Sequence, residues 1–221
     1  MDLDKLEKLA KQEMLDRDEH EGREPGWLYF HGRRVGKLAV WLAKELGADV
    51  DPDVLYVAGL FHDIGKGEAD HALAGAKKAG KLLKKLCTEQ ELEQIAELIE
   101  WHNRRGEEGR SLAVGIIQDA DILDHVGPVG PWLAYYWSGR HVETFADHLH
   151  YYHSEENTQT RQRLYAHLNF EASQREYIRR VQYEDAVIQT LERVYEQGVW
   201  EAAGQEGRRW SPQPYHEPQE S

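Results

Sequence analysis

The sequence predicts an all-α protein, and three observations lead to this prediction. Apolar residues recur at spacings of three and four along most of the chain, as they do on one face of a helix. Side chains that favour helix starts stand before several of these segments, and glycines that favour helix ends follow some of them. We find no convincing alternation of apolar and polar residues and no internal repeat, so strands are not expected.

Two helices are expected near the beginning of the chain. Residues 2–15 carry an apolar residue at every third or fourth position, which forms one apolar stripe. Residues 27–46 repeat this pattern, with Val35 and Leu42 among the inward positions. Gly47 follows the second segment and is a typical stop signal for a helix.

The next two helices are expected from their first residues. Asp51 followed by Pro52 is a strong helix start, because the acid caps free N–H groups and proline fits the first turn. We expect this helix to end near residue 64, before Gly65. Asp70 is the expected cap of a following helix that carries a stripe of small residues.

Two further helices complete the expected core, and more helices follow it. Residues 88–91 form a capping box that opens a helix up to about His102. Ser111 caps the next helix, which the Gly- and Pro-rich segment 127–131 ends. Residues 132–198 are expected to form two or three long helices that are polar on much of their surface.

The chain is predicted to form a single domain. Its 221 residues allow one large domain or two small ones, and 40% hydrophobic residues are enough for a core. We expect one helical domain over residues 1–200, in which a motif core covers about 20–130 and a helical extension about 131–200. Residues 201–221 form a polar, proline-rich tail, and packing of this tail on a second subunit of a homodimer stays open.

The composition excludes several classes of protein and partner. The single cysteine, Cys87, rules out a disulfide framework within the chain. We recognise neither a signal peptide nor an apolar run long enough to span a bilayer, so we expect a cytoplasmic protein without membrane contact. A net charge of −13 argues against a nucleic-acid polymer as partner, because phosphate backbones need a basic surface. A small phosphorylated ligand stays compatible with this charge.

Four polar side chains from three predicted helices are expected to face one core. His31 lies four residues before Val35 on the inward face, and His62 also occupies an inward position, directly before Asp63. Asp121 lies on the inward face of a later helix. Buried imidazoles and carboxylates are unfavourable without partners. A shared metal would satisfy all four, and this mixed N and O set suits Mn, Fe, Co, Ni or Zn.

Four segments between about residues 20 and 130 also carry a family resemblance. They are LYFHGRRVGKLAVWLA around His31, LFHDIGKGE around His62 and Asp63, IEWHN around His102, and IIQDADILDHVG around Asp121. Together they resemble the HD superfamily of metal-dependent phosphohydrolases, and most closely its small bacterial one-domain members. The resemblance implies an all-α HD-domain bundle in which one metal per chain is bound by His31, His62, Asp63 and Asp121. Asp119 is expected to support the ligands from outside this set.

The residues suggest how such a site would act on phosphorus. A bound metal lowers the pKa of its water toward neutrality and polarises a phosphoryl group. Asp63 is expected to hold the ion and orient that water. Lys66 lies on the turn after the HD helix and can neutralise a phosphate oxygen as charge shifts in the transition state.

Further residues are candidates for contacts with the phosphate. His71 stands in the first turn of a new helix, where anions are favoured, and His102 faces inward from its own helix. We expect both to line the phosphate pocket, with His102 as a contact or general acid, and binding of a second metal by them is the alternative. Arg104 or Arg105, on the loop after His102, can clamp phosphate with its guanidinium group.

The expected function is hydrolysis of a phosphomonoester or phosphoanhydride bond in a small phosphorylated substrate, a nucleotide. One alternative is a binuclear iron HD oxygenase, which requires both His71 and His102 as metal ligands. Another is a regulatory HD module that binds a nucleotide without turnover, although the intact ligand set argues against it. The sequence does not identify the exact substrate, the native metal or the oligomeric state.

Two aromatic segments have open roles. Residues 141–153 carry four histidines with aromatic residues between them, and we expect a helix with a polar, aromatic-rich surface over the pocket mouth. A dense aromatic patch follows the 127–131 break and contains Trp132, Tyr135, Tyr136 and Trp137. Core packing is its default role, and stacking on a base or sugar ring is the alternative.

Overall fold

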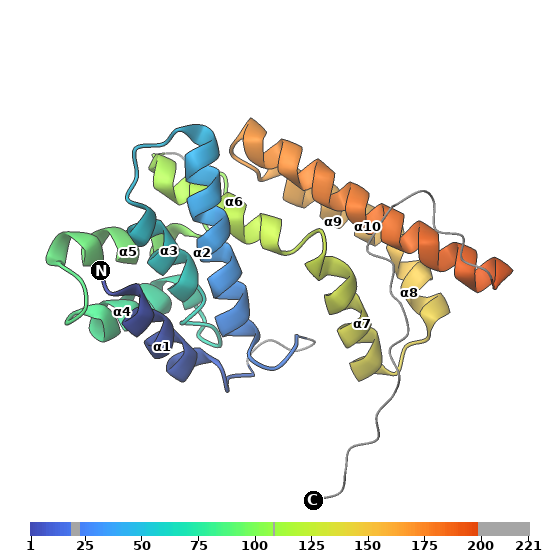
Figure 1. Cartoon of the computed structure of the whole chain (residues 1–221), viewed down its shortest axis with the longest axis horizontal. Coiled ribbons are helices and arrows are strands. Elements are labelled where there is room, and N and C mark those ends of the chain that lie inside the picture. The colour runs from blue at the N-terminus through green and yellow to red at the C-terminus, as the bar shows by residue number, and fades with distance from the viewer. Residues whose placement is uncertain (19–22, 108, 199–221) are drawn as a thin grey trace, which may run out of the picture.

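The computed structural model describes residues 1–18, 23–107 and 109–198, and every regular element in these residues is a helix. The prediction of an all-α fold is therefore confirmed (Figure 1). The helices are α1 (Leu3–Met14), α2 (Trp27–Leu46), α3 (Pro52–Phe61), α4 (His71–Leu83), α5 (Glu89–Trp101), α6 (Leu112–Asp124), α7 (Val129–His141), α8 (Phe145–Tyr152), α9 (Glu155–Ala166) and α10 (Glu171–Gln197). The predicted tail 201–221 lies outside the described residues.

Several helices begin at the capping side chains that predicted them. Asp51, Asp70 and Ser111 each accept a hydrogen bond from a backbone N–H in the first turn of α3, α4 and α6. Thr88 and Glu91 form the expected capping box at the start of α5. These caps satisfy N–H groups that have no partner within the helix, so they fix where each helix begins.

The backbones of α2 and α3 cross almost in contact. A Cβ atom on Gly32 would lie 2.3 Å from the carbonyl oxygen of Leu60, and a Cβ on Gly59 would lie 2.6 Å from the Cα of Gly36. Any side chain at these positions would overlap the neighbouring backbone, so the crossing requires glycine. The close approach brings the end of α3 beside His31 on α2.

The main hydrophobic core lies among α1 to α6 and reaches α7. Its members from α1 are fully buried, and they are Leu6, Ala10 and Met14. Full burial of a large apolar side chain stabilises the fold by about 1.5–3 kcal/mol. The first helix is therefore an integral part of the core that positions the polar cluster described below.

The C-terminal half contains four helices in the described residues, whereas two or three long helices were predicted. α7 ends at Val142, which adopts a left-handed backbone conformation with φ 57° although it is not glycine. Thr144 and Asp147 then form a capping box that starts α8. The turns between α7 and α10 contain neither glycine nor proline, so the usual stop signals are absent, although Thr144 and Ser154 cap the helices that follow.

The helices form two groups that meet at α6 and α10. Figure 1 shows α1 to α5 on one side and α7 to α10 on the other, with α6 running between them. A second apolar cluster joins the end of α6 to the C-terminal helices, and it comprises Ile122, Leu123, Val126, Leu168 and Tyr177. Arg180 on α10 also donates a 2.8 Å hydrogen bond to the carbonyl oxygen of Leu123. These contacts hold the two groups together beside the functional site.

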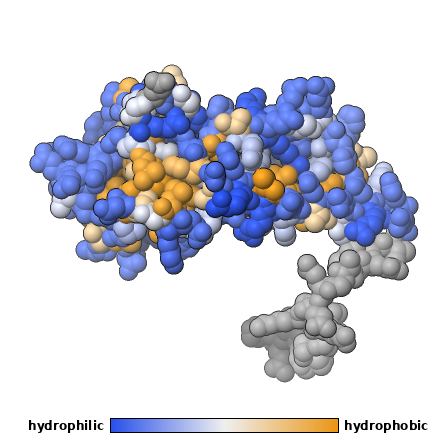
Figure 2. Space-filling view, turned by 90° about the horizontal axis from the view of Figure 1, so that it is seen from above, coloured by the Kyte–Doolittle hydropathy of each residue, from blue (hydrophilic) through white to orange (hydrophobic). Residues whose placement is uncertain are grey.

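The surface is largely polar. Figure 2 shows one face that is mostly hydrophilic, with hydrophobic residues gathered in patches along its middle. Such a surface agrees with the net charge of −13. Among the helices of the described residues, none combines the length and apolar character that a membrane span requires.

Candidate metal centre

His31 projects from α2 into the core, where it is almost fully buried. Its Nε2 lies 3.2 Å from Oδ1 of Asp121 on α6. Its Nδ1 donates a 2.7 Å hydrogen bond to Oδ2 of Asp124 at the end of the same helix. The imidazole also stacks on Trp27, with a centroid distance of 4.8 Å and an interplanar angle of 9°. These neighbours fix the plane of the His31 ring.

His62 directly follows α3, which ends before the position near residue 64 that was predicted. Its Nδ1 donates a 2.8 Å hydrogen bond to the carbonyl oxygen of Gly59. Because a carbonyl oxygen only accepts, Nε2 keeps its lone pair. This Nε2 lies 3.7 Å from Oδ2 of Asp63 and 3.7 Å from Oδ1 of Asp121. The free nitrogen of His62 therefore faces both carboxylates.

His102 repeats this arrangement at the end of α5. Its Nδ1 donates a 2.6 Å hydrogen bond to the carbonyl oxygen of Ile99, and its Nε2 lies 3.7 Å from Oδ1 of Asp63. His71, in the first turn of α4, places its Nε2 3.6 Å from the same carboxylate oxygen. Asp63 thus faces His62 with one oxygen and faces His71 and His102 with the other.

His125 also belongs to the cluster, although no role was predicted for it. Its Nε2 lies 3.6 Å from Oδ1 of Asp121, and its ring centroid lies 5.0 Å from that of His31. The signal was present in the sequence, because His125 follows Asp121 by four residues and therefore shares its helix face. The structure adds it to the residues within reach of a metal.

The surroundings of His62 and His31 shift their pKa values in opposite directions. Burial lowers the pKa of His62 to about 4, so its ring is neutral at physiological pH. Burial alone would also lower the pKa of His31, but hydrogen bonds to Asp121 and Asp124 outweigh it and raise this pKa to about 9. Burial opposes ionisation of Asp121 as well, yet His125 and His31 hold its pKa well below the usual range. Metal binding at His31 would therefore release a proton.

The donor atoms fit a divalent transition metal. Three groups of side chains place their ligand atoms within 4.8 Å of one another, and they are His31–His62–Asp63, His31–Asp121–His125 and Asp63–His71–His102. Imidazole nitrogens and carboxylate oxygens are common ligands of Mn, Fe, Co, Ni and Zn. The structure brings together all the residues predicted as metal ligands, namely His31, His62, Asp63 and Asp121. The third group also keeps the second-metal alternative open.

Two cationic side chains border the carboxylates. The Nζ of Lys66 lies 3.4 Å from Oδ2 of Asp63, as its place on the following turn led us to expect. Arg105 donates a 2.5 Å hydrogen bond to Oδ2 of Asp121. Both side chains line the cavity described below, so both can reach an anion there.

The structure places Arg104, a predicted substrate contact, outside the lining of the cavity. Its guanidinium donates a 3.1 Å hydrogen bond to Glu100 on α5 and lies 5.1 Å from the centre of the Trp101 ring. The loop after His102 turns so that Arg105 lines the cavity and Arg104 packs along α5. Of the two neighbouring arginines, Arg105 is the one placed to meet a ligand.

Asp119, which was expected to support the ligands, instead holds the start of α10. It is fully buried and accepts hydrogen bonds from the backbone N–H of Asn169, at 2.9 Å, and of Phe170, at 3.2 Å. Burial raises the pKa of this carboxyl, although these hydrogen bonds oppose the shift. The carboxylate that supports His31 is Asp124, three residues later in the sequence than the predicted ligand Asp121.

A cavity of about 930 Å³ opens beside the cluster. One side of it is formed by residues of the cluster and its cations, which are Asp63, Lys66, His71, His102, Arg105, Asp121 and His125. The opposite side is formed by residues of α7 to α10. This volume lies in the range of about 300–1,000 Å³ that is typical of small-molecule sites.

Comparisons with known proteins agree with this architecture. Residues 28–125 match the model of the HD domain family. The bifunctional uridylyltransferase/uridylyl-removing enzyme of Novosphingobium aromaticivorans is 41% identical over 88 residues, which are 38% of this chain and 10% of that enzyme. The chain therefore covers about a tenth of the length of this curated relative.

Solved structures share the fold over most of the chain. A predicted HD superfamily hydrolase from an uncultured Thermotogales bacterium has a TM-score of 0.62 and 20% identity, covering 87% of this chain and 92% of that chain. Bacillus subtilis YpgQ in complex with ADP has a TM-score of 0.61 and 18% identity, with coverages of 88% and 98%. An HD-superfamily hydrolase from Bacillus thuringiensis has a TM-score of 0.62 and 23% identity, with coverages of 89% and 100%.

The matched family segment contains the whole polar cluster, from His31 to His125. The structural likeness also extends through the C-terminal helices that close the cavity. Motif and cluster lie within residues 28–125, the segment that matches the HD domain family, and the fold is consistent with an HD-domain protein.

Proposed function

We propose that this chain is a metal-dependent phosphohydrolase that acts on a small phosphorylated molecule, a nucleotide. The observation that carries the proposal is the buried His/Asp cluster in the wall of a cavity that Lys66 and Arg105 also line. Metal ligands and cations on one wall together favour an anion with several oxygens, as a phosphate has. When bound, a divalent metal supplies Lewis acidity, which polarises a phosphoryl group and acidifies a water molecule.

The carboxylates and cations of the chain have separate roles in this proposal. Asp63 turns its two oxygens toward different histidines, so it can hold the ion and accept a hydrogen bond from the attacking water. Lys66 lies beside Asp63 and would neutralise charge on a phosphate oxygen in the transition state. Arg105 can exchange its contact with Asp121 for a phosphate oxygen, because its guanidinium has further donors.

His71 and His102 are proposed to contact the phosphate. His71 lies in the first turn of α4, where unpaired backbone N–H groups favour an anion. Burial lowers the pKa of His71, and the nearby Lys66 lowers it further, so its ring is neutral at physiological pH. His102 presents its Nε2 to the same carboxylate oxygen and can serve as a contact or a general acid.

The same two histidines also support a second candidate. Asp63, His71 and His102 place their ligand atoms within 4.8 Å of one another, so these residues would hold a second ion. A binuclear centre would favour oxidative chemistry over hydrolysis if both ions were iron. The number of metal ions per chain separates this candidate from the proposed one.

Relatives support a nucleotide as the substrate. Bacillus subtilis YpgQ, which shares the fold, has been solved in complex with ADP. The curated relative is named for uridylyl transfer and uridylyl removal. Each statement concerns that protein, and for this chain both make nucleotides the first substrates to test.

The test is a screen of nucleotides and sugar phosphates against protein loaded in turn with Mn, Co, Ni, Mg and Fe. Both phosphate and pyrophosphate are measured, because their ratio identifies the bond that breaks. The Asp63→Asn variant serves as the inactive comparison, and Asp49→Asn, in the exposed turn after α2, serves as the matched control. Turnover by both the native chain and Asp49→Asn, but not by Asp63→Asn, is expected. Equal turnover by Asp63→Asn would refute the proposed site.

A further inference from the structure

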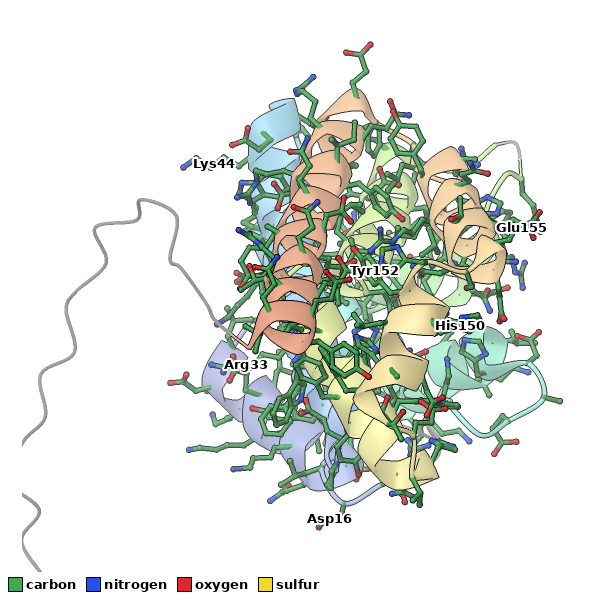
Figure 3. All side chains as sticks on the ribbon, turned by 90° about the vertical axis from the view of Figure 1, so that its right-hand side faces the viewer. Asp16, Arg33, Lys44, His150, Tyr152 and Glu155 are labelled. Carbon is green, nitrogen blue, oxygen red and sulfur yellow. The ribbon has the colours of Figure 1, made fainter. Side chains whose placement is uncertain are left out.

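The half of the cavity remote from the metal cluster is built by the C-terminal helices. We call it the distal half, and its principal residues are Trp137, His148, Tyr151, Tyr152, Arg161 and Glu184. Figure 3 shows Tyr152 in the interior between α8 and α10, whereas His150 lies on the outer side of α8. Tyr152 hydrogen-bonds to Asp185 of α10 through its hydroxyl group, which agrees with this view. The helix α8 therefore presents one face to the cavity and the other to solvent.

Charge divides the cavity into two unlike halves. Lys66 and Arg105 stand beside the metal cluster, where a phosphate group would lie. The distal half instead carries carboxylates, among them Glu143, Asp147 and Glu156. Carboxylates repel a second anionic group and accept hydrogen bonds from neutral donors. A ligand that fills both halves thus has its phosphate at one end and an uncharged, donor-bearing group at the other.

Two arginines lie near this half. Arg23 also lines the cavity and interacts electrostatically with Tyr151, whereas the charge of Arg161 is already matched. Arg161 donates hydrogen bonds of 2.8 Å to Glu184 and 3.0 Å to Asp185. Its guanidinium also lies 4.5 Å from the centre of the Tyr152 ring. Glu184 accepts a further 2.7 Å hydrogen bond from the backbone N–H of Gly127. This network matches the charge of Arg161, so Arg161 offers little attraction to a second anion.

His148 presents an unused hydrogen-bonding atom to the distal half. The side chain is only 6% exposed, and among the described residues its Nε2 has no hydrogen-bond partner. Its ring meets Tyr135 edge-on, with centroids 5.6 Å apart, so packing holds it in place. Leaving a buried polar atom without a partner is unfavourable by about 1–3 kcal/mol. A group that a ligand brings into the cavity would satisfy this nitrogen.

Aromatic rings complete the distal half. Tyr151 and Tyr152 follow His148 by three and four residues, so they share its face of α8. One face of Trp137 is covered by His141, with centroids 3.8 Å apart, and Arg161 lies over Tyr152. Tyr151 is 47% exposed and lines the cavity. A flat heterocycle would gain stacking contact on such a ring.

We propose that the distal half is a nucleobase subsite, in which His148 hydrogen-bonds the edge of the base and Tyr151 stacks on its face. The proposal rests on the proposed function, because it assigns the phosphate of the same ligand to the metal cluster. It goes further by naming the residues that select the neutral part of the substrate. Burial, opposed by Glu143, lowers the pKa of His148, so its ring is neutral and offers one donor and one acceptor at physiological pH.

Binding of nucleosides without phosphate tests the subsite independently of metal and turnover. Adenosine, guanosine, cytidine and uridine are titrated into the full chain and followed by calorimetry, with ribose 5-phosphate as the ligand that lacks a base. The variants are His148→Phe, which keeps a ring but removes its nitrogens, and Tyr151→Ala. His150→Phe is the matched control, because His150 is exposed on the outer side of α8. Circular dichroism verifies that each variant is folded.

At least one nucleoside is expected to bind the native chain, with a Kd that rises about two- to tenfold in His148→Phe. Tyr151→Ala is expected to raise the same Kd about five- to hundredfold, the usual range for loss of a stacking ring. Neither variant is expected to change binding of ribose 5-phosphate, and His150→Phe is expected to leave every Kd unchanged. If His148→Phe unfolds, the test rests on Tyr151→Ala. The Tyr151 side chain is exposed, so its removal is expected to leave the fold intact.

Two outcomes overturn the subsite. One is no nucleoside binding to the native chain at millimolar concentration, and the other is an unchanged Kd in the folded variants. These results are distinct from failure of the proposed function. Nucleoside binding without any phosphate release would keep the subsite and reject the phosphohydrolase. Phosphate release without nucleoside binding would reject the subsite and keep the phosphohydrolase.

Discussion

The Nδ1 of His31 lies 2.7 Å from Oδ2 of Asp124, and this contact leaves Nε2 as the nitrogen that faces Asp121. Asp124 is itself held by Arg34, whose Nε donates to Oδ1 at 2.8 Å. A carboxylate behind a ligand histidine orients the ring and increases its basicity. The pair therefore links a predicted metal ligand to a buried charge network that the sequence did not reveal.

Replacing Asp124 by Asn is expected to weaken metal binding without removing a ligand. The amide keeps the size of the side chain but loses the charge that favours Nδ1–H of His31, so affinity falls by about 10–100-fold. Competition with a chelator of known affinity measures the change. Asp49→Asn is the control for a lost surface carboxylate, and an unchanged affinity in Asp124→Asn would contradict the supporting role.

Asp63→Ala is expected to remove both bound metal and hydrolysis. Asp63 belongs to two of the candidate ligand groups, so its loss removes a ligand from both of them. In the native chain, metal at a hundredfold excess over its Kd stabilises the fold by about 2.7 kcal/mol, which a chelator removes. Elemental analysis and thermal unfolding with and without chelator are the measurements. Full occupancy in the variant, or an unchanged chelator effect, would show that Asp63 is not a ligand.

The first half of the fold was predictable because its signals are local. Asp51, Asp70 and Ser111 each cap the start of a helix, and these residue types are typical of that position. The inward positions of the histidines follow from helical spacing. The helix ends within the C-terminal half were not predictable, because no glycine or proline follows α7, α8 or α9. Val142 ends α7 in a left-handed conformation that β-branched residues rarely adopt, so no stop residue marks the end of this helix, although Thr144 caps the next one.

The sequence predicted site residues whose position on a helix face follows from a motif. It did not predict the direction of side chains on a loop. Arg104 and Arg105 are neighbours in sequence, and only the path of the loop turns Arg105 to Asp121 and Arg104 to Glu100. Asp119 also faces inward, but its partner Asn169 lies 50 positions later in the chain. Such long-range partners follow from tertiary packing, which helical periodicity does not encode.

His71→Ala is expected to keep about one metal per chain while turnover falls by roughly 10²–10⁴-fold, the scale for losing an electrostatic donor or a general acid. The reason is the position of His71 at the start of α4, where backbone N–H groups favour phosphate over a cation. Metal content and turnover are measured on the same preparations, with His102→Ala in parallel. If either change halves the metal of a two-metal protein, the centre is binuclear and the phosphate role is wrong.

The pH dependence of stability is expected to change in His148→Phe. Burial lowers the pKa of His148 below its ordinary 6.5, so below that pH the unfolded chain binds protons more readily than the folded chain. The free energy of unfolding therefore falls as pH decreases from above 6.5 toward the folded-state pKa, and this part levels off below it. Urea unfolding of chelator-treated protein at pH 7.5 and 5.5 measures the fall. It is expected to be smaller in His148→Phe than in the native chain, and His150→Phe is expected to match the native chain.

The two neighbouring arginines give the most direct test of how the site meets phosphate. Arg105 donates to Asp121 inside the cavity, so it can transfer to a phosphate oxygen, whereas Arg104 is paired with Glu100. Loss of a hydrogen bond between charged groups costs about 1.5–3 kcal/mol, so Arg105→Ala is expected to lower kcat/KM by about 10–150-fold. Arg104→Ala removes the same charge one residue away and is expected to change kcat/KM less than twofold. Metal content is measured in both variants, because Arg105→Ala also removes a hydrogen bond from the predicted metal ligand Asp121. An unchanged metal content shows that the loss of activity is not a loss of metal. Equal effects of the two variants would mean that general charge near the cavity, and not a contact of Arg105, attracts the substrate.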